Sequence, residues 1–406
     1  MLNTVKAKTL RSSHIFLYLE QYPIYFYLAS VIIYIILYVS FINNINQDYI
    51  IWLQPWHGQI QAGGFASLKY DFYNYAPAYM YLIYLATLLP VQAVISIKLL
   101  ALPIVPVAGY YLAHLSTIIR PRTSKLEWLA FTATVLTPTI LLNSAYWGQA
   151  DVFYGTACLA CVVYLIDKQP ISAMTAFGVA IAFKAQAIFL APFIIVMLIK
   201  RQLPWRLVVI PPTVWVLSVA PVVFVGKPIE DVILMYLRQA DTYHALCMNC
   251  TNLWSMFPTI DYGMGVAIGI LSALSASGAY VWFMVTHLSI HNRHQIFIAA
   301  LISVMVVPFF LPKMHDRYFY VAELFSVGLL LFHWQDLLIP LLLQVSTGNV
   351  YWQYLLRKGF LYPQFESGIL NVIVIGLLIQ LFIKIERHKP IVQTPLGEVP
   401  RSDSGE

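Results

Sequence analysis

The chain contains few charged residues: Asp, Glu, Lys and Arg make up only 10% of its 406 residues, whereas 60% are hydrophobic. A water-soluble domain with so few charges could not cover its surface, so this composition excludes a soluble fold and predicts a polytopic membrane protein. No polar segment is long enough to form a separate soluble domain. We expect one transmembrane domain over residues 1–390 and a disordered tail over 391–406.

Further absences narrow the function. The chain has no G-x-G-x-x-G loop for a nucleotide. It has no internal repeat, which disfavours a transporter built from inverted repeats. No small-residue cleavage site follows the first apolar run, so we expect that run to be an anchor rather than a removed signal. Basic membrane loops account for the net charge of +6, and we expect no nucleic-acid partner.

Basic clusters between the apolar runs predict the topology, because loops rich in Lys and Arg lie on the cytoplasmic side. If all of them are cytoplasmic, the number of crossings between successive clusters must be even. These clusters are Lys6/Lys8/Arg11, Arg120/Arg122/Lys125, Lys200/Arg201/Arg206, His291/Arg293/His294 and Lys384/Arg387/Lys389.

The first span is predicted over residues 22–42 and the returning span over 91–119. The short apolar run 77–90 then has no crossing to make, so we expect it to lie in the outer interface. The predicted fold is all-α, with about twelve transmembrane helices and this interfacial helix in the first outer loop. The remaining expected spans are 127–142, 152–166, 171–183, 188–200, 207–225, 263–287, 295–311, 319–334, 336–347 and 367–384.

The four cysteines form two pairs. Cys158 and Cys161 lie within a predicted span and are expected to be packing residues. Cys247 and Cys250 lie in an outer loop, where their spacing favours a small disulfide in an oxidising compartment. Redox catalysis and metal binding are the alternatives, but a single C-x-x-C lacks a second pair of ligands.

The polar residues that could carry chemistry fall on the predicted outer side. Asp48 follows the first span and is either a helix N-cap or a general base for an acceptor hydroxyl. Asp71, Asn74 and Tyr75 precede Pro77, which fixes where the interfacial helix begins. An aromatic belt at the lipid headgroups is the alternative for the tyrosine.

An outer turn at residues 143–151 combines a stacking face, an amide and a carboxylate in Trp147, Gln149 and Asp151. Asp151 has a second interpretation as the cap of the following helix. Lys184 lies in an apolar stretch, where a lysine costs on the order of 3 kcal/mol at the membrane centre. An anionic partner explains it better than snorkelling does, and Lys98 is a weaker case of the same kind.

Residues 313–318 place Lys313, His315 and Arg317 beside Asp316. Three potential cations around one acid predict an anion site, since an arginine can bind a phosphate through two hydrogen bonds. A surface ion cluster is the alternative.

Together these motifs resemble those of the GT-C superfamily of membrane glycosyltransferases, whose donors are polyprenyl-phosphate-linked sugars. The resemblance covers most of residues 15–335, and it rests on the order of short motifs and on their shared outer face. The motifs are the first-loop acid Asp48, the element Asn74, Tyr75 and Pro77, the WGQ-x-D turn with Trp147, Gln149 and Asp151, the FK-x-Q element Phe183, Lys184 and Gln186, and the MH-x-RY element Met314, His315, Arg317 and Tyr318.

The resemblance implies that Asp48 is the catalytic base. It also implies that basic residues bind the donor phosphate: Lys184 and Arg317, with His315 and Lys98 in support. We expect the sugar or the acceptor to contact Asp71, Asn74, Tyr75, Trp147, Gln149, Asp151 and Gln186. Many family members carry paired acids in the first outer loop, whereas this chain has a lone acid after Gln47. We therefore expect no metal and no other cofactor, although the sequence does not exclude a divalent metal.

The implied reaction is inverting transfer of one sugar, a hexose such as mannose, from a polyprenyl-phosphate donor to a hydroxyl group. The acceptor is expected to be a glycan, lipid or protein of the cell envelope on the non-cytoplasmic face. We expect an integral protein of the bacterial inner membrane with its site facing the periplasm, a eukaryotic lumen being the alternative. The competing classes are a transporter or flippase for a lipid-linked glycan, and a scaffold in a glycolipid-assembly complex. A transporter needs polar residues on both faces, whereas here they lie on one.

Overall fold

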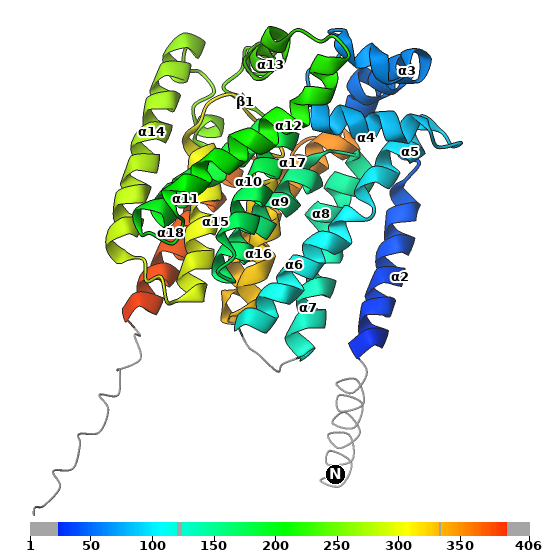
Figure 1. Ribbon diagram of the computed structural model, residues 1–406. Coiled ribbons are helices and arrows are strands. Elements are labelled where there is room, and N and C mark those ends of the chain that lie inside the picture. The colour runs from blue at the N-terminus through cyan, green and yellow to red at the C-terminus, as the bar shows by residue number, and fades with distance from the viewer. Residues whose placement is uncertain (1–22, 120–123, 333, 388–406) are drawn as a thin grey trace, which may run out of the picture.

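The computed structural model describes residues 23–119, 124–332 and 334–387, and they form a bundle that is almost entirely helical (Figure 1). The structure therefore confirms an all-α protein with helices suited to a membrane. The predicted tail over 391–406 and the basic residues Arg120, Arg122 and Lys389, like the cluster at Lys6, lie outside the described residues.

Six helices in the described ranges are long and apolar enough to cross a membrane, and a pair bent by 48° at residues 136–137 raises that number to seven. The predicted number of twelve is not confirmed. Four of the predicted spans form apolar helices of only 10–17 residues, whereas a straight crossing needs about 20. The six long helices are Ile24–Phe41, Ala93–Ile119, Trp205–Phe224, Tyr262–His287, Arg293–Phe310 and Gln364–Ile385.

The N-terminal half contains the first long helix, the outer loop and the broken helices around the site. Its elements are α2 (Pro23–Phe41), the π-helical η1 (Tyr49–Leu53), α3 (Gln54–Gly63), the 3-10 segment η2 (Phe65–Lys69), α4 (Pro77–Thr87), α5 (Ala93–Ala101), α6 (Ile104–Ile119), α7 (Ser124–Val135), α8 (Pro138–Leu141), the π-helical η3 (Leu142–Trp147), α9 (Asp151–Ile166), α10 (Pro170–Phe183), the 3-10 segment η4 (Ala185–Leu190) and α11 (Ala191–Ile199).

The C-terminal half adds the long peripheral helices and a two-stranded sheet. Its elements are the 3-10 segment η5 (Trp205–Val209), α12 (Ile210–Phe224), α13 (Ile229–Asp241), β1 (Cys247–Met248), η6 (Leu253–Met256), α14 (Tyr262–His287), α15 (Arg293–Phe310), β2 (Met314–His315), α16 (Tyr320–Val327), η7 (Gly328–Leu331), η8 (Trp334–Leu337), α17 (Leu338–Leu356) and α18 (Gln364–Arg387). The two strands pair in parallel.

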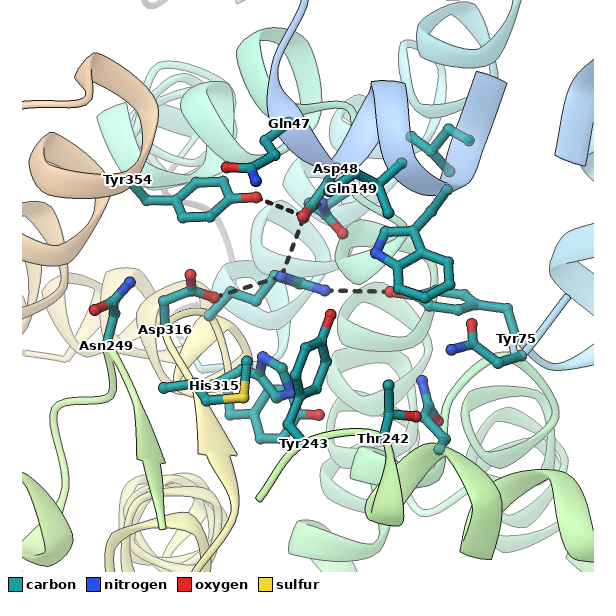
Figure 2. A pocket seen from close by; sticks show the side chains of 18 of the residues that line it. Gln47, Asp48, Tyr75, Gln149, Thr242, Tyr243, Asn249, His315, Asp316 and Tyr354 are labelled. Carbon is teal, nitrogen blue, oxygen red and sulfur yellow. Dashed lines mark hydrogen bonds and ion pairs between the residues drawn. The ribbon is translucent and has the colours of Figure 1, made fainter. Parts of the chain in front are cut away.

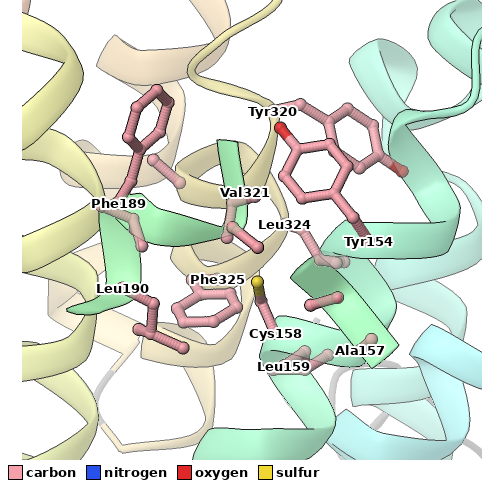
Figure 3. Close-up of a cluster of buried hydrophobic side chains, with 14 of the residues drawn as sticks. Tyr154, Ala157, Cys158, Leu159, Phe189, Leu190, Tyr320, Val321, Leu324 and Phe325 are labelled. Atoms are coloured by element: carbon pink, nitrogen blue, oxygen red, sulfur yellow. The ribbon is translucent and has the colours of Figure 1, made fainter. Parts of the chain in front are cut away.

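The protein core is built around α9, α15 and α16. In the apolar window of α15, 89% of the residues are buried inside the protein, against only 17% in the window of α2, which leaves α2 facing lipid. Figure 3 shows the packing of α9 against η4 and α16, with Cys158 between Leu324 and Phe325. At Gly155 a Cβ atom would lie 2.8 Å from the ring of Tyr320, so a side chain there would push the two helices apart.

The predicted interfacial helix is α4, which begins at Pro77 as expected and has only 11 residues. Proline suits this first helical position, because its missing N–H would have no partner within the helix. The span predicted at 91–119 is interrupted after Ala101, where α5 ends before α6 starts at Ile104. The outer loop 226–262 is not irregular, since it contains α13 and β1.

The loops at opposite ends of the bundle differ in chemistry. At one end, the ends of α6, α9, α11 and α18 and the α14–α15 turn surround a cavity whose lining includes Lys168, His291 and Arg293. At the other end lie α3, α13 and β1, shown at the top of Figure 1. His291 and Arg293 of a predicted cytoplasmic cluster thus lie at one end, whereas the other end carries the reactive polar residues together with the cations Lys227, Arg238 and Arg357.

Candidate active site

A polar pocket of about 210 Å³ opens at the end of the bundle marked by α3, α13 and β1 (Figure 2). This volume is below the roughly 300–1,000 Å³ of pockets for drug-sized ligands, so the pocket suits a smaller ligand or part of a larger one. Its charged and imidazole side chains are Asp48, Lys184, His315, Asp316 and Arg317. Its aromatic side chains are Trp52, Trp56, Tyr75, Tyr243, Tyr318 and Tyr354, and its amides are Gln47, Asn74, Gln149, Gln239 and Asn249.

Asp48 lies in this pocket and is held by donors from three other parts of the chain. Its Oδ2 atom accepts hydrogen bonds from Trp147 Nε1 at 2.9 Å and Gln149 Nε2 at 2.7 Å. Its Oδ1 atom accepts from the Tyr354 hydroxyl, and Arg317 Nη1 lies 3.5 Å from Oδ2. Asp48 makes no helix-capping hydrogen bond. Its side chain remains 20% exposed, so a ligand in the pocket can reach this oriented carboxylate.

The turn after η3 positions Trp147 and Gln149, the two residues that donate hydrogen bonds to Asp48 Oδ2. Gly148 has a φ of 77°, a left-handed conformation that glycine adopts without steric cost. The turn lets Trp147 and Gln149 point toward the same oxygen atom. Trp147 is fully buried and stacks on Tyr354 at a ring distance of 4.5 Å, so it orients Asp48 and does not line the pocket.

Asp151 is fully buried below the pocket and binds two cations. Its Oδ1 accepts a hydrogen bond from Lys184 Nζ, and its Oδ2 lies 3.3 Å from Arg317 Nε. Asn143 donates a further hydrogen bond to Oδ2 at 3.0 Å. The capping interpretation is therefore wrong for Asp151, and snorkelling is wrong for Lys184, which is only 4% exposed. Buried charges of opposite sign satisfy one another here.

Arg317 joins the three carboxylates. Besides Asp48 and Asp151, its guanidinium contacts Asp316 Oδ1 at 3.4 Å and donates to the Tyr75 hydroxyl at 3.3 Å (Figure 2). Its side chain is 12% exposed, which excludes a loose surface ion cluster. In formal charge, Lys184 and Arg317 balance Asp48 and Asp151.

The two neighbours of Arg317 have displaced pKa values. Burial, helped by Arg317 and Lys184, lowers the pKa of His315 to about 3, so the imidazole is neutral at pH 7. Burial also raises the pKa of Asp316 to about 7, although Arg317 acts in the opposite direction. The expectation of three cations in this motif is therefore wrong for His315, and Lys313 instead lies over the ring of Tyr262 at 5.3 Å.

If the pocket binds the anionic donor expected from the sequence, the raised pKa of Asp316 predicts that this donor binds more tightly as the pH falls. Below pH 7 the Asp316 carboxyl is neutral, and above it the carboxylate adds a negative charge that repels a phosphate. We expect the KM for the donor to rise about tenfold between pH 6 and pH 8. Steady-state kinetics of Asp316→Asn should show a flat KM over this range, and an unchanged slope would contradict the assignment.

Lys98 does not contribute to the pocket. Its Nζ atom donates to three backbone oxygens, those of Phe41 at 3.1 Å, Asn44 at 2.7 Å and Tyr146 at 2.8 Å. The side chain is 2% exposed. The expected role in phosphate binding is therefore wrong, because carbonyl oxygens already engage all three donors of this lysine.

Lys98→Met is predicted to destabilise the fold without changing the binding of the substrate that donates the sugar. The substitution leaves three backbone oxygens without their donor, and an unsatisfied buried group costs about 1–3 kcal/mol. Unfolding in detergent micelles should show this loss, while the folded fraction keeps the wild-type KM for the donor. A KM raised tenfold would instead restore a role for Lys98 in binding.

Asp71 is not brought to the pocket either. Its carboxylate is 57% exposed and lies 3.1 Å from Arg238 Nη1 of α13 and 3.7 Å from Lys227 Nζ. Asp231 accepts a second hydrogen bond from Arg238, at 2.9 Å. These four residues form a charged cluster on the rim, which explains why Asp71 does not act as a sugar ligand inside the pocket.

The other predicted sugar contacts are divided between two cavities. Asn74 and Tyr75 line the pocket, and Asn74 Oδ1 is buried without a hydrogen-bond partner among the described residues. Such an acceptor suits a ligand hydroxyl. Gln186 lines an adjoining cavity, which shares Tyr318 with the pocket.

Cys247 and Cys250 form a disulfide beside the pocket. The strand that starts at Cys247 pairs with β2, so that Met248 lies opposite His315. Gln364 Nε2 at the start of α18 donates to the backbone oxygen of Cys250 at 2.7 Å. The disulfide loop thus forms one wall of the pocket, with Met248 and Asn249 in its lining.

Sequence reasoning missed several residues of the site. Tyr354 lies beyond the span predicted at 336–347, because α17 continues to Leu356. Trp52, Trp56 and Tyr243 gave no signal apart from their aromatic character. A signal was available for Glu323, an acidic residue inside an apolar helix, which is fully buried and lies 3.4 Å from the hydroxyl of Tyr351.

Metal ligands do not gather in the described part of the chain, where no group of three or more His, Cys, Asp and Glu side chains is placed to hold an ion. Comparison with known proteins adds no family: neither a scan against protein-family models nor a search of curated proteins gives a match. The resemblance to the GT-C superfamily thus rests on the sequence motifs alone.

Proposed function

We propose that this protein is an inverting membrane glycosyltransferase of the GT-C type that moves one sugar from a polyprenyl-phosphate donor to an acceptor hydroxyl. One observation carries the proposal: the oriented carboxylate of Asp48 faces a small polar pocket that shares a wall with a more apolar cavity, which we take as the start of a lipid groove. Such a combination suits a substrate with a sugar, a phosphate and a long lipid tail.

The groove begins at a cavity of about 350 Å³ that adjoins the pocket. The two share five lining residues: Gln239, Tyr243, Met248, His315 and Tyr318. A more apolar cavity of about 440 Å³ lies farther along the same two elements, α14 and η4–α11, and shares no lining residue with the first. On α14 the lining runs from Val266 to Val285, about 28 Å at 1.5 Å per residue. This length matches the roughly 30 Å hydrocarbon layer, so the groove suits the polyprenyl tail.

Placing the tail in this groove puts the donor phosphate where the cavities join, beside His315 and Tyr318. Lys184 and Arg317 are the cations of that region. They are balanced by carboxylates in the resting site, so their charge is offset until a phosphate enters. Fixed charges of this kind contribute roughly 2.7–4 kcal/mol each when negative charge develops in a transition state.

In the proposed reaction the acceptor oxygen attacks the anomeric carbon while its proton passes to Asp48. The new bond joins carbon to the acceptor oxygen, and the bond from carbon to the phosphate oxygen breaks. Its electron pair leaves with polyprenyl phosphate, and the single displacement inverts the anomeric centre. Trp147, Gln149 and Tyr354 keep Asp48 oriented throughout.

The orientation of the protein follows from its two ends. The turn with His291, Arg293 and His294 lies at the end opposite the pocket, which favours a cytoplasmic location for that end. The disulfide beside the pocket suits an oxidising compartment. We therefore propose that the site faces the periplasm from the bacterial inner membrane, and that the acceptor is a lipid-linked or envelope glycan, a lipid or a protein.

The proposal is tested with purified protein in lipid nanodiscs, supplied with a panel of labelled polyprenyl-phosphate hexoses and envelope lipid extract. Transfer of label from one hexose, mannose being the first candidate, to a product supports the enzyme. If no donor loses its sugar while the labelled lipid changes leaflets in reconstituted vesicles, the flippase is the correct class.

A further inference from the structure

A second polar cavity, of about 520 Å³, lies at the end of the bundle opposite the active site. The ends of α6, α9, α11 and α18 and the turn between α14 and α15 form its walls. None of its residues belongs to the pocket around Asp48, and the proposed reaction does not use it.

The lining of this cavity is amphiphilic. Its polar part includes the cationic side chains Lys168 and Arg293, with His291 and Asn292 beside them. Its apolar part includes Met197 and, from the ends of other helices, Ile119, Ile166, Phe332 and Ile385. None of the described residues that line it is Asp or Glu.

Two described carboxylates close in sequence to lining residues of this cavity are engaged elsewhere. Asp167, next to Lys168, lies 3.4 Å from His114 and accepts a hydrogen bond from Gln169 at 2.6 Å. Asp336 faces the imidazole of His294, at 4.0 Å. Lys168 and Arg293 therefore have no carboxylate among the described residues that line the cavity.

The hydrogen-bond geometry of the rim leaves donors for a ligand. Arg293 donates a hydrogen bond from Nη1 to the backbone oxygen of Ile118, which anchors the guanidinium at the cavity. The other guanidinium nitrogens take no part in this bond. Asn292 caps α15 through a hydrogen bond to the Gln295 backbone N–H at 3.1 Å. The 18-residue α15 thus starts at the cavity and adds its positive dipole end to the two cations.

We propose that this cavity binds the phosphate group of an anionic phospholipid from the leaflet on that side of the membrane. A lipid headgroup and soluble phosphate would both present a phosphate anion to Lys168 and Arg293. The apolar walls and the position at a membrane-facing end of the bundle favour a lipid over soluble phosphate, because they can cover the glycerol and upper acyl chains. Basic pockets between transmembrane helices bind lipid headgroups in this manner.

The test measures the binding of phosphatidylglycerol and phosphatidylcholine with identical acyl chains to the full-length protein in detergent micelles, by native mass spectrometry. Binding of inorganic phosphate is measured in parallel, to test whether the cavity binds soluble phosphate instead of a lipid. The variant is Lys168→Gln/Arg293→Gln, and Lys168→Gln alone leaves the anchor to Ile118 intact in case the double variant does not fold. The control, Lys200→Gln/Arg206→Gln, removes the same charge outside the cavity.

We expect wild type to prefer phosphatidylglycerol. Each cation near a lipid headgroup contributes about fivefold in affinity, so the double variant should bind it about 25-fold more weakly, and Lys168→Gln about fivefold more weakly. The control should keep the wild-type value. The proposal is overturned if the control loses as much affinity as the double variant, if both lipids bind equally, or if inorganic phosphate alone occupies the site.

Discussion

Asp48→Asn is expected to lower the turnover number for sugar transfer by about 10²–10⁴-fold, the contribution typical of a positioned general base. The amide cannot accept the proton of the acceptor hydroxyl, although it has nearly the shape of the carboxylate. Because the donor phosphate lies with Lys184 and Arg317 in the proposed site, the KM for the donor should change little. Initial rates with the purified variant in nanodiscs measure both quantities.

The matched control is Asp71→Asn, the same substitution at an acid that also lies in the first outer loop. Its carboxylate is 57% exposed in the rim cluster, so turnover should stay at the wild-type value. Near-normal turnover by Asp48→Asn would contradict the mechanism. An equal loss of turnover in both variants would show that activity depends on the negative charge of the outer face and not on one catalytic base.

Asp151→Asn is expected to destabilise the protein by about 3–5 kcal/mol, the cost of breaking a buried ion pair from one side. This change leaves both Lys184 and Arg317 without their buried carboxylate. Lys184→Met should cost less, because Asp151 keeps Arg317 Nε and the Asn143 amide. The double variant should lose less than the sum of the two single losses, by a coupling energy of about 0.5–3 kcal/mol.

Unfolding by SDS titration in mixed micelles gives the free energy of unfolding for each variant. The control is Asp231→Asn, which removes the partner of Arg238 on the rim and should change stability by at most about 1 kcal/mol. Additive losses in the double variant, equal to the sum of the single ones, would show that Asp151 and Lys184 do not act as a pair.

The sequence predicts the helical class well, because long apolar runs between basic loops have few alternatives. It predicts the number of crossings poorly. Short helices such as α9 and α10 are apolar enough for a membrane. Their position depends on packing, of α9 against α15 and α16 and of α10 against α9 and α12, which hydropathy does not describe. The early end predicted for α17 has a similar cause: Asn349, a polar residue, is buried against Ser367 of α18.

The site was predicted best where a residue type is unusual in its surroundings. Lys184 in an apolar stretch and Asp48 after a span both lie in the pocket. Lys98 misled for the same reason, because the sequence does not reveal that backbone oxygens from two other segments meet its ammonium group. Tyr354 could not be predicted, since its contact with Asp48 joins residues 306 positions apart.

The most direct test of the central claim is the stoichiometry of the reaction catalysed by the purified protein. With a doubly labelled donor, wild type should form polyprenyl phosphate and glycosylated product in equal amounts, with inverted anomeric configuration. Asp48→Asn should form both about 10²–10⁴-fold more slowly. Movement of the intact donor between leaflets, with its sugar still attached, would contradict the account and identify a transporter.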